Sequence, residues 1–406
     1  MTSDFRKISA AEYREYFGKS LEPSLLQAPA WPDLKEAWEP LRFASFRAGE
    51  AVALAQVLIR RFPFAQEFAY LAMGPTLLEA ECTAVEADRL ACLEGIIDYL
   101  KRQRKNCFLF KVQTPRLRKC FSLDEAEPEA DLAADKAYLE AMSKLGFRHR
   151  GLSRDLESTT QPRYQALIYK TDWEAGKHAR LRYNLRQLER RSVTVFKSSV
   201  AELDSFMHCI NCTEERQEIA LRDRQYFERL IELFGQEAEL FLARIDAQTG
   251  RKKASRELAE LEAELAACPE HAKKKRNQIE ERLNSARKIS EFFAEISDVD
   301  TADIAAALLV NLGRVSELPY AGNDERFFTV PASWGIYNAI IESSFAHGAW
   351  RINLGGLDGN FADGLTRFKA HFNPRIEENY GEFDLPLKAV RAKLFQKLLE
   401  YRKRHI

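Results

Sequence analysis

The chain has 406 residues, of which 46% are hydrophobic, and its 61 basic residues balance 61 acidic ones. This length exceeds what one hydrophobic core usually supports, so two domains are expected. The zero net charge excludes a uniformly basic nucleic-acid-binding protein, and any contact with phosphate must come from local patches.

Seven cysteines are scattered along the chain, and only Cys209 and Cys212 form a close pair. A single CxxC beside His208, with no second pair, is a poor zinc site, so we predict buried thiols and no bound metal. An odd cysteine count without a disulfide framework is typical of a reducing compartment. The charged N-terminus lacks an apolar signal core, and no apolar run approaches the ~20 residues that span a bilayer. We therefore expect a soluble, cytoplasmic protein.

The first half of the chain predicts a mixed α/β structure, because an antiparallel meander gives way to alternating helix and strand. Residues 25–38 (LLQAPAWPDLKEAW) are expected to be helical, which would place Trp31 and Lys35 on one face. An aromatic ring beside a cation suits a nucleotide diphosphate, although a core tryptophan with an exposed lysine is the alternative. The further predicted elements are a hairpin at 42–60, strands at 68–73 and 107–113, and helices at 90–104 and up to Gly146.

The second half repeats this mixture of elements. The predicted strands lie through Leu156, at 166–169, 193–196, 238–245, 302–311 and 314–320, and the predicted helices at 173–191, 200–216, 224–234 and 332–347. A strand at 350–354 then leads into a glycine-rich loop at 355–359.

Two basic features belong to the second half. Residues 177–191 (KHARLRYNLRQLERR) are dense in Lys and Arg with a single Glu, and such a one-sided helix needs an acidic partner or a salt-bridged neighbour. We predict that its arginines contact the phosphates of an acidic partner. They are Arg180, Arg182, Arg186, Arg190 and Arg191. The second feature is the run RQEIALRDRQYF, in which Arg222 suits a diphosphate because a guanidinium binds phosphate in two places. Ion pairing with the neighbouring Glu residues is the alternative.

Residues 251–296 shift in composition to Ala, Glu, Lys, Arg and Leu. Apolar residues recur there at spacings of three and four on both sides of Pro269, which predicts an antiparallel coiled-coil hairpin. At the end of the chain, residues 387–406 predict an amphipathic helix, whose apolar stripe contains Val390, Leu394 and Leu398. Packing on the first domain is expected, and a basic rim against a membrane surface is the alternative.

Near the end of the second half, Lys369 lies among Phe361, Phe368 and Phe372 in sequence. Partial desolvation would strengthen the field of this lysine on a developing negative charge, whereas a surface lysine beside core aromatics is the alternative.

Six sequence pieces between residues 320 and 387, taken in order, resemble the signature of the FemABX family of peptidoglycan aminoacyltransferases. They are Tyr320 with Gly322, Trp334, Asn353 with Gly355 and Gly356, Gly364 with Leu365, Phe368 with Lys369 and Phe372, and residues 381–386. The resemblance implies two acetyltransferase-like (GNAT) domains, residues 1–147 with 381–406 and residues 148–380. The coiled-coil insertion at 251–296 is similar to the arm of FemA-, FemB- and MurM-like members.

The resemblance also implies an activity and its residues. Family members move an amino acid, here of the Ala, Ser or Gly class, from aminoacyl-tRNA to the side-chain amine of the stem peptide. The acceptor is lipid II or UDP-MurNAc-pentapeptide, and no cofactor is expected. Lys369 would stabilise the oxyanion, with Phe368 fixing its position. The implied substrate-binding residues are Trp31, Lys35, Arg216, Arg222, Tyr226, Asn353, Gly355 and Gly356. For a tRNA donor, we predict that the five arginines of residues 177–191 contact its acceptor end.

Two features test this resemblance against other functions. The family usually has an Asp before the proline that follows the strand 107–113, and Thr114 stands there instead. An acetyl-CoA-dependent acetyltransferase would need a Gln/Arg-x-x-Gly-x-Gly/Ala loop for the pyrophosphate, and the sequence has no such run. A non-catalytic scaffold built on the coiled coil is the remaining alternative.

Overall fold

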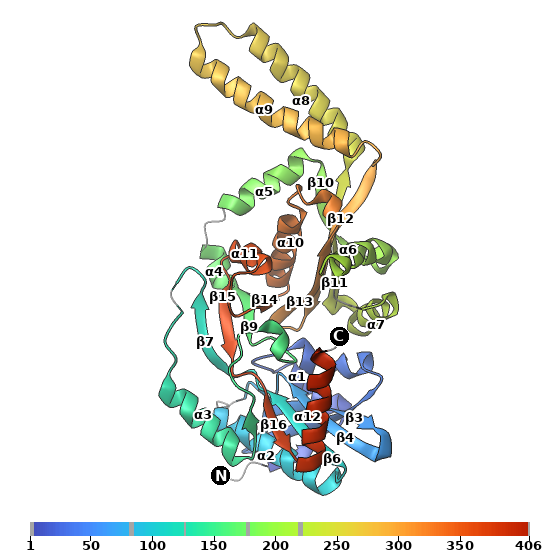
Figure 1. The fold of residues 1–406 in the computed structure, drawn as a ribbon, viewed down its shortest axis with the longest axis vertical. Coiled ribbons are helices and arrows are strands. Elements are labelled where there is room, and N and C mark those ends of the chain that lie inside the picture. The colour runs from blue at the N-terminus through green and yellow to red at the C-terminus, as the bar shows by residue number, and fades with distance from the viewer. Residues whose placement is uncertain (1–3, 81–84, 126, 176–178, 218–221, 405–406) are drawn as a thin grey trace.

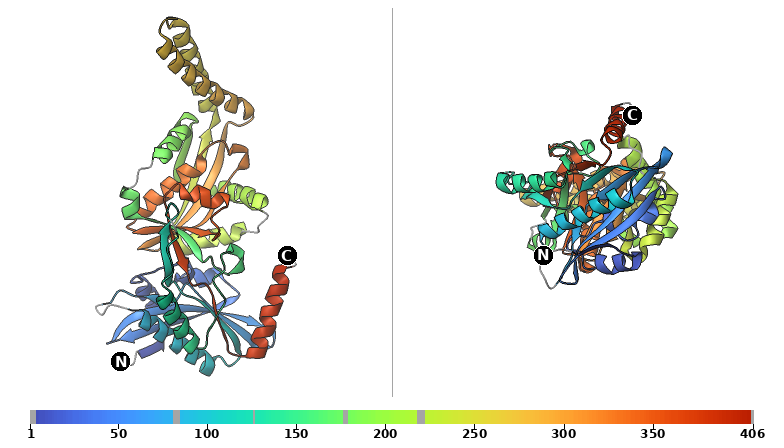
Figure 2. Two further views of the ribbon diagram at one scale, coloured as in Figure 1. Left: turned by 60° about the vertical axis from the view of Figure 1, so that its left-hand side comes forward. Right: turned by 90° about the horizontal axis from the view of Figure 1, so that it is seen from below.

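The computed structural model describes residues 4–80, 85–125, 127–175, 179–217 and 222–404 (Figure 1). The architecture is mixed α/β, as predicted, with two eight-stranded sheets stacked along the long axis of the molecule. A long helical hairpin projects from the end of the second sheet (Figures 1 and 2). Within these ranges, no helix combines the length and the apolar character that crossing a membrane requires.

The first sheet has the order β1-β2-β3-β4-β6-β16-β8, with β5 paired to β3. Its strands are β1 (Asp4–Lys7), β2 (Trp38–Arg47), β3 (Glu50–Phe62), β4 (Gln66–Ala72), β5 (Thr76–Leu77), β6 (Cys107–Gln113), β8 (Arg148–His149) and β16 (Phe383–Pro386). Apolar side chains alternate between the two faces of these strands, so the sheet carries a core on each side. Helices α2 (Glu86–Gln103) and α3 (Leu132–Lys144) cover one face, and α1 (Ala10–Phe17) and α12 (Ala389–Arg404) pack on the other.

The second sheet has the order β10-β11-β12-β13-β14-β9-β15-β7. Its strands are β7 (Leu117–Ser122), β9 (Tyr164–Tyr169), β10 (Val193–Ser198), β11 (Ala238–Asp246), β12 (Thr301–Asn311), β13 (Val315–Asn323), β14 (Arg351–Leu357) and β15 (Arg375–Asn379). Helices α5 (Ala179–Arg190), α10 (Ala332–Ala346) and α11 (Gly364–Ala370) lie on one face, whereas α6 (Leu203–Gln217) and α7 (Arg224–Phe234) lie on the other (Figure 1).

The centre of the second sheet contains a fork. β13 and β14 are parallel neighbours, but they pair only over residues 315–317 and 351–353. Beyond that point β13 stays paired to β12 as far as Asn323, and β14 stays paired to β9 as far as Leu357. The two strands therefore separate after Glu317 and Asn353, and we call this region the β13–β14 fork.

Several local predictions were wrong. Residues 25–38 form two 3₁₀ turns, η1 (Leu25–Gln27) and η2 (Trp31–Leu34), because prolines at 29 and 32 remove helix donors. The strand expected through Leu156 is a 3₁₀ turn there. The predicted helix 173–191 is divided into α4 (Lys170–Ala175) and α5, and its residues 176–178 lie outside the described ranges. The predicted loop at 355–359 begins later, because β14 continues through both glycines.

The two sheets exchange strands. β7 pairs with β15 in the second sheet, although it precedes β8, which belongs to the first. After the second sheet is complete, the chain returns, and β16 pairs between β6 and β8. Sheet membership alone does not define folding units, so the expected division into residues 1–147 with 381–406 and 148–380 stays a proposal.

The helical hairpin consists of α8 (Ala247–Ala267) and α9 (Lys273–Glu295), and we call it the arm. Its outer half packs on itself through apolar residues at the predicted spacing, with Leu261 and Leu283 buried together. Its base, however, belongs to the main core of the second sheet, which includes Phe292 and Phe293. The ring of Phe293 occupies the space beside Gly250, where a Cβ would lie 2.1 Å from a ring carbon. The arm is therefore anchored in the body of the protein.

The C-terminal helix α12 packs on the first sheet, but through a different face from the predicted one. Ala392 is buried, and Phe395 lies against Phe108, with ring centroids 5.2 Å apart. The predicted apolar stripe faces outward: Val390, Leu394 and Leu398 are 83%, 61% and 59% exposed. Figure 2 shows α12 lying along the outside of the molecule.

Candidate active site

Lys369 is a buried lysine on α11. Asp363 caps the start of this short helix by accepting a hydrogen bond from the Thr366 amide at 2.9 Å. The Lys369 side chain is directed into the protein, where its Nζ donates to the Gly356 carbonyl at 3.1 Å. Only 3% of the residue is exposed, and burial lowers the pKa of Lys369 to about 7, opposed by the carboxylate of Asp363. The lysine is thus poised between its charged and neutral forms near neutral pH.

Phe368 holds the neighbouring side of α11 in a cluster of aromatic rings. Its ring meets Trp334, Tyr337 and Phe372 edge to face, at centroid distances of 5.9, 4.9 and 5.5 Å. Such contacts add to simple burial and fix the rotation of a short helix. The sequence predicted the role of Phe368 in positioning Lys369, but it did not single out Tyr337.

The three predicted residues of β14 lie beside Lys369. Asn353 donates from Nδ2 to Gln165 at 2.6 Å and accepts from the Gly355 amide at 2.8 Å. Gly355 has a φ of +90°, and a Cβ there would lie 3.6 Å from the Lys369 Nζ and 3.8 Å from the Leu318 carbonyl. The end of the Lys369 side chain is therefore at the β13–β14 fork. At Gly356, a Cβ would lie 2.4 Å from Pro162, so that position tolerates only glycine.

A second cluster surrounds Lys35. Its Nζ lies 4.4 Å from the centre of the Trp31 ring and 5.2 Å from that of Tyr226. Burial between the rings lowers the pKa of Lys35 to about 8, with a smaller effect from the charge of Arg222. Tyr320 donates a hydrogen bond to the Tyr226 hydroxyl at 3.1 Å. A partly desolvated ammonium held by aromatic rings is a strong point for attracting an anion.

Arg222 joins the Lys35 cluster, since its guanidinium lies 5.3 Å from the centre of the Tyr226 ring. Two cations that share one aromatic residue repel each other unless an anion lies between them. The side chain of Arg216, which was also predicted to bind substrate, lies outside what the structure describes.

The Lys369 and Lys35 clusters lie on opposite faces of the second sheet. Phe368 packs with α10 in one core, whereas Trp31, Tyr226 and Tyr320 belong to the core under α6 and α7. The fork lies between them, with Tyr320 on its β13 side and Gly355 on its β14 side. At the closed end of the fork, the Glu317 carboxylate accepts from the Leu25 amide at 3.0 Å and so anchors the segment that carries Trp31.

The five predicted tRNA-contacting arginines fall into two groups. Arg180, Arg182 and Arg186 are exposed on α5, and the guanidinium of Arg180 lies 5.7 Å from the centre of the Trp334 ring. Arg190 is engaged with the arm instead, since it donates to Glu257 of α8 at 3.0 Å and to Ser285 of α9 at 2.9 Å. Arg191 is partly buried and donates to the Gln187 side chain at 2.8 Å.

Thr114, which departs from the family pattern, is buried and forms a hydrogen bond of 2.7 Å with the Tyr138 hydroxyl.

Comparisons with known proteins identify chains that are similar to this one over most of its length. The model of the FemAB family matches residues 8–400. A lipid II:glycine glycyltransferase of Staphylococcus aureus (strain MRSA252) is 25% identical over 409 residues, covering 94% of this chain and 92% of the relative. The crystal structure of FemX superposes with a TM-score of 0.70 at 23% identity, covering 96% of this chain and 99% of FemX. A tandem GNAT protein from the clavulanic acid biosynthesis pathway superposes with a TM-score of 0.46 at 9% identity.

Proposed function

Because this chain belongs to the FemAB family, we propose that it is an aminoacyltransferase that extends the stem peptide of a peptidoglycan precursor. The observation that supports the proposal is the β13–β14 fork, which lies between the cationic Lys35 cluster on one face of the sheet and the buried Lys369 on the other. A substrate with a diphosphate at one end and a reactive amine at the other fits this arrangement.

The Lys35 cluster is the proposed site for the diphosphate of the acceptor. The side chains of Lys35 and Arg222 both contact the Tyr226 ring, and their mutual repulsion would be relieved by an intervening anion. Trp31 provides an aromatic surface for a base or sugar beside them. Tyr320 lies at the margin of this cluster and on the fork, so the remainder of the acceptor would pass from here towards Lys369.

Transfer would take place beside Lys369. The neutral side-chain amine of the stem peptide attacks the ester carbonyl of the donor, forming a C–N bond and a tetrahedral oxyanion. The charged Lys369 stabilises that oxyanion, while Phe368 and its neighbouring rings hold the ammonium in place. When the intermediate collapses, the C–O bond breaks and the ribose hydroxyl leaves with a proton derived from the attacking amine.

The proposed donor is an aminoacyl-tRNA carrying Ala, Ser or Gly. The exposed residues Arg180, Arg182 and Arg186 form a short basic ridge, and Arg180 stands next to the Trp334–Phe368 cluster. A tRNA acceptor end bound along this ridge would present its ester at α11. Arg190 contacts the arm and Arg191 donates to Gln187 of α5, so in this proposal neither residue extends the ridge.

A lipid-linked acceptor is favoured over a UDP-linked one by helix α12. Its outward stripe of Val390, Leu394 and Leu398 is flanked by exposed lysines at 393 and 397. Such a surface suits the interface of an anionic membrane, where apolar side chains enter the headgroup region and lysines meet phosphate.

The test is transfer of a labelled amino acid from charged tRNA to each of the two acceptors. With lipid II in anionic vesicles, wild-type protein should form labelled product, and the double variant Leu394→Glu, Leu398→Glu should lose both vesicle binding and that product. With soluble UDP-MurNAc-pentapeptide, the same double variant should transfer the amino acid at the wild-type rate. This equality would show that the variant is folded. No product with any donor on either acceptor would refute the proposed function. Equal rates of the variant and wild type on vesicles would refute the role of α12.

A further inference from the structure

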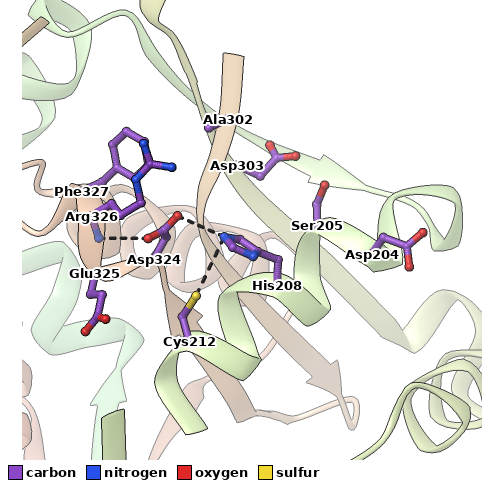
Figure 3. A pocket seen from close by; sticks show the side chains of 10 residues that line it. All are labelled: Asp204, Ser205, His208, Cys212, Ala302, Asp303, Asp324, Glu325, Arg326 and Phe327. Carbon is purple, nitrogen blue, oxygen red and sulfur yellow. Dashed lines mark hydrogen bonds and ion pairs between the residues drawn. The ribbon is translucent and has the colours of Figure 1, made fainter. Parts of the chain in front are cut away.

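A cluster of metal-ligating side chains lies on the second sheet apart from the Lys369 and Lys35 clusters. Among the described residues, His208, Cys212 and Asp324 form one group whose ligand atoms all lie within 4.8 Å of one another. His208 Nε2 is 3.0 Å from Asp324 Oδ2 and 3.9 Å from the Cys212 Sγ. Figure 3 shows the three side chains pointing towards one another at the edge of a pocket.

The backbone fixes these residues from two sides. His208 and Cys212 are four residues apart on α6, so they share one face of the helix. Asp324 follows the last residue of β13, and its Oδ1 accepts from the Arg326 amide at 2.9 Å, which leaves Oδ2 for the cluster. At Gly322 the strand approaches α6 so closely that a Cβ would lie 2.4 Å from the Cys209 carbonyl oxygen. The Thr213 hydroxyl accepts from the Asn323 amide at 3.1 Å and secures the same junction.

The arrangement does not suit a nucleophilic thiol activated by histidine. In such a relay, the thiol and the carboxylate use different ring nitrogens, so that the imidazole passes a proton between them. Here Cys212 and Asp324 both face Nε2 of His208. Convergence of nitrogen, sulfur and carboxylate oxygen on one point is instead what a metal ion requires.

Two of the three ligand distances are close to those of a small tetrahedral ion, and the third pair, Cys212 and Asp324, lies within 4.8 Å, so a rotation of the Cys212 side chain would close the site. With bonds of about 2.0–2.3 Å, a tetrahedral zinc ion sets its nitrogen–oxygen and nitrogen–sulfur ligand pairs about 3.4 and 3.6 Å apart. The corresponding distances here are 3.0 and 3.9 Å. The adjoining pocket, about 510 Å³, is also lined by Asp204, Asp303 and Glu325 against the single basic residue Arg326, and Asp303 is paired with Arg244. The lining is therefore acidic on balance, which favours a cation. The pocket would leave the fourth position open to water.

We propose that His208, Cys212 and Asp324 form a site for a divalent metal ion of the zinc class. The mixed imidazole, thiolate and carboxylate set selects zinc or cobalt over magnesium or calcium, which prefer oxygen ligands alone. The ion would join α6 to the end of β13, and this role is independent of the proposed aminoacyl transfer. The sequence pointed away from the site, because it offered the CxxC pair, whereas Cys209 is buried with its thiol near the Asp303 carbonyl.

The test uses the full-length protein, freed of metal by chelation and titrated with Co²⁺. We expect one equivalent to produce a thiolate-to-cobalt charge-transfer band in the near ultraviolet, together with the visible bands of tetrahedral cobalt, and Zn²⁺ to displace it. Cys212→Ser should abolish the charge-transfer band. His208→Gln should weaken binding at least about 100-fold, because loss of even an outer-shell partner costs about 10–100-fold. Cys120→Ser is the matched control, since Cys120 is also a partly exposed free thiol, and it should bind as wild type does.

A second readout does not depend on spectroscopy of a variant. Zn²⁺ should slow alkylation of Cys212 by iodoacetamide in wild-type protein and leave that of Cys120 unchanged, as peptide mapping would reveal. Absence of a one-equivalent cobalt band, its persistence in Cys212→Ser, or equal alkylation of Cys212 with and without zinc would each overturn the proposal.

Discussion

Replacing Lys369 by Met tests the burial on which the proposed chemistry depends. The variant keeps a long unbranched side chain but cannot carry a charge. In the wild type, burial lowers the pKa of Lys369 from 10.5 to about 7. The unfolded chain therefore binds more protons than the folded one between about pH 7 and about pH 10.5. In that pH range, the free energy of unfolding of the wild type should therefore increase with pH relative to that of the variant.

The size of this gain follows from the two pKa values. One pKa unit corresponds to about 1.4 kcal/mol, and at pH 7 the folded lysine is already half neutral. Between about pH 7 and about pH 9, the stability of wild type minus that of Lys369→Met should therefore rise by about 2 kcal/mol. Urea unfolding at several pH values measures this difference. Lys101→Met, at an exposed position of α2, controls for the loss of one positive charge.

The same variant separates stability from catalysis. If Lys369 stabilises the oxyanion, turnover should fall about 10²–10³-fold, as expected for one such donor, while the protein remains folded. Parallel pH–stability curves for wild type and Lys369→Met would refute the buried, half-neutral lysine. A folded variant with wild-type turnover would refute its catalytic role.

Three further predictions concern other parts of the molecule. Lys35→Ala should weaken binding of UDP-MurNAc-pentapeptide about 10–100-fold by calorimetry. Because the Lys35 pKa is about 8, the affinity of the wild type should fall above that pH, and Lys35→Arg should remove this fall. A wild-type affinity that does not change with pH would contradict the contact between Lys35 and the diphosphate. Charge reversal of Arg182 and Arg186 to Glu should lower the salt dependence of the KM for charged tRNA by about 1–2 units of logarithmic slope, and an unchanged slope would place the tRNA elsewhere. Phe293→Ala should lower the free energy of unfolding by about 3–5 kcal/mol, and a loss below about 1 kcal/mol would show that the arm base contributes little to the core.

The sequence predicted most of the elements whose signal is local. The apolar run of β6 has the bounds that were expected, and the leucine spacing around Pro269 correctly indicated the arm. The contact between Trp31 and Lys35 was also expected, although a 3₁₀ turn brings it about rather than an α-helix. Local spacing therefore identifies neighbours along the chain even where the backbone differs in detail.

What the sequence could not show depends on pairing between distant segments. Predicting the fork would require the knowledge that β13 and β14 pair over only three residues, and no local sequence pattern indicates this. The hydrogen bond between His208 and Asp324 joins residues 116 positions apart. In α12, amphipathicity identified which residues are apolar but not which side meets the protein. The helix packs through Phe395 and Ala392, and the apolar stripe stays exposed.

The return of β16 to the first sheet has a consequence for biosynthesis. β16 fills the position between β6 and β8, yet it lies more than 230 residues after β8 and leaves the ribosome only after the whole second sheet. Until then, β6 and β8 present unsatisfied edges, which attract other strands. The nascent chain must hold an incomplete first sheet while the entire second sheet and the arm are synthesised, and a truncation before residue 383 would leave that sheet permanently open. Termination just before β16 should therefore yield aggregated protein, even though every residue of both candidate site clusters has already been made.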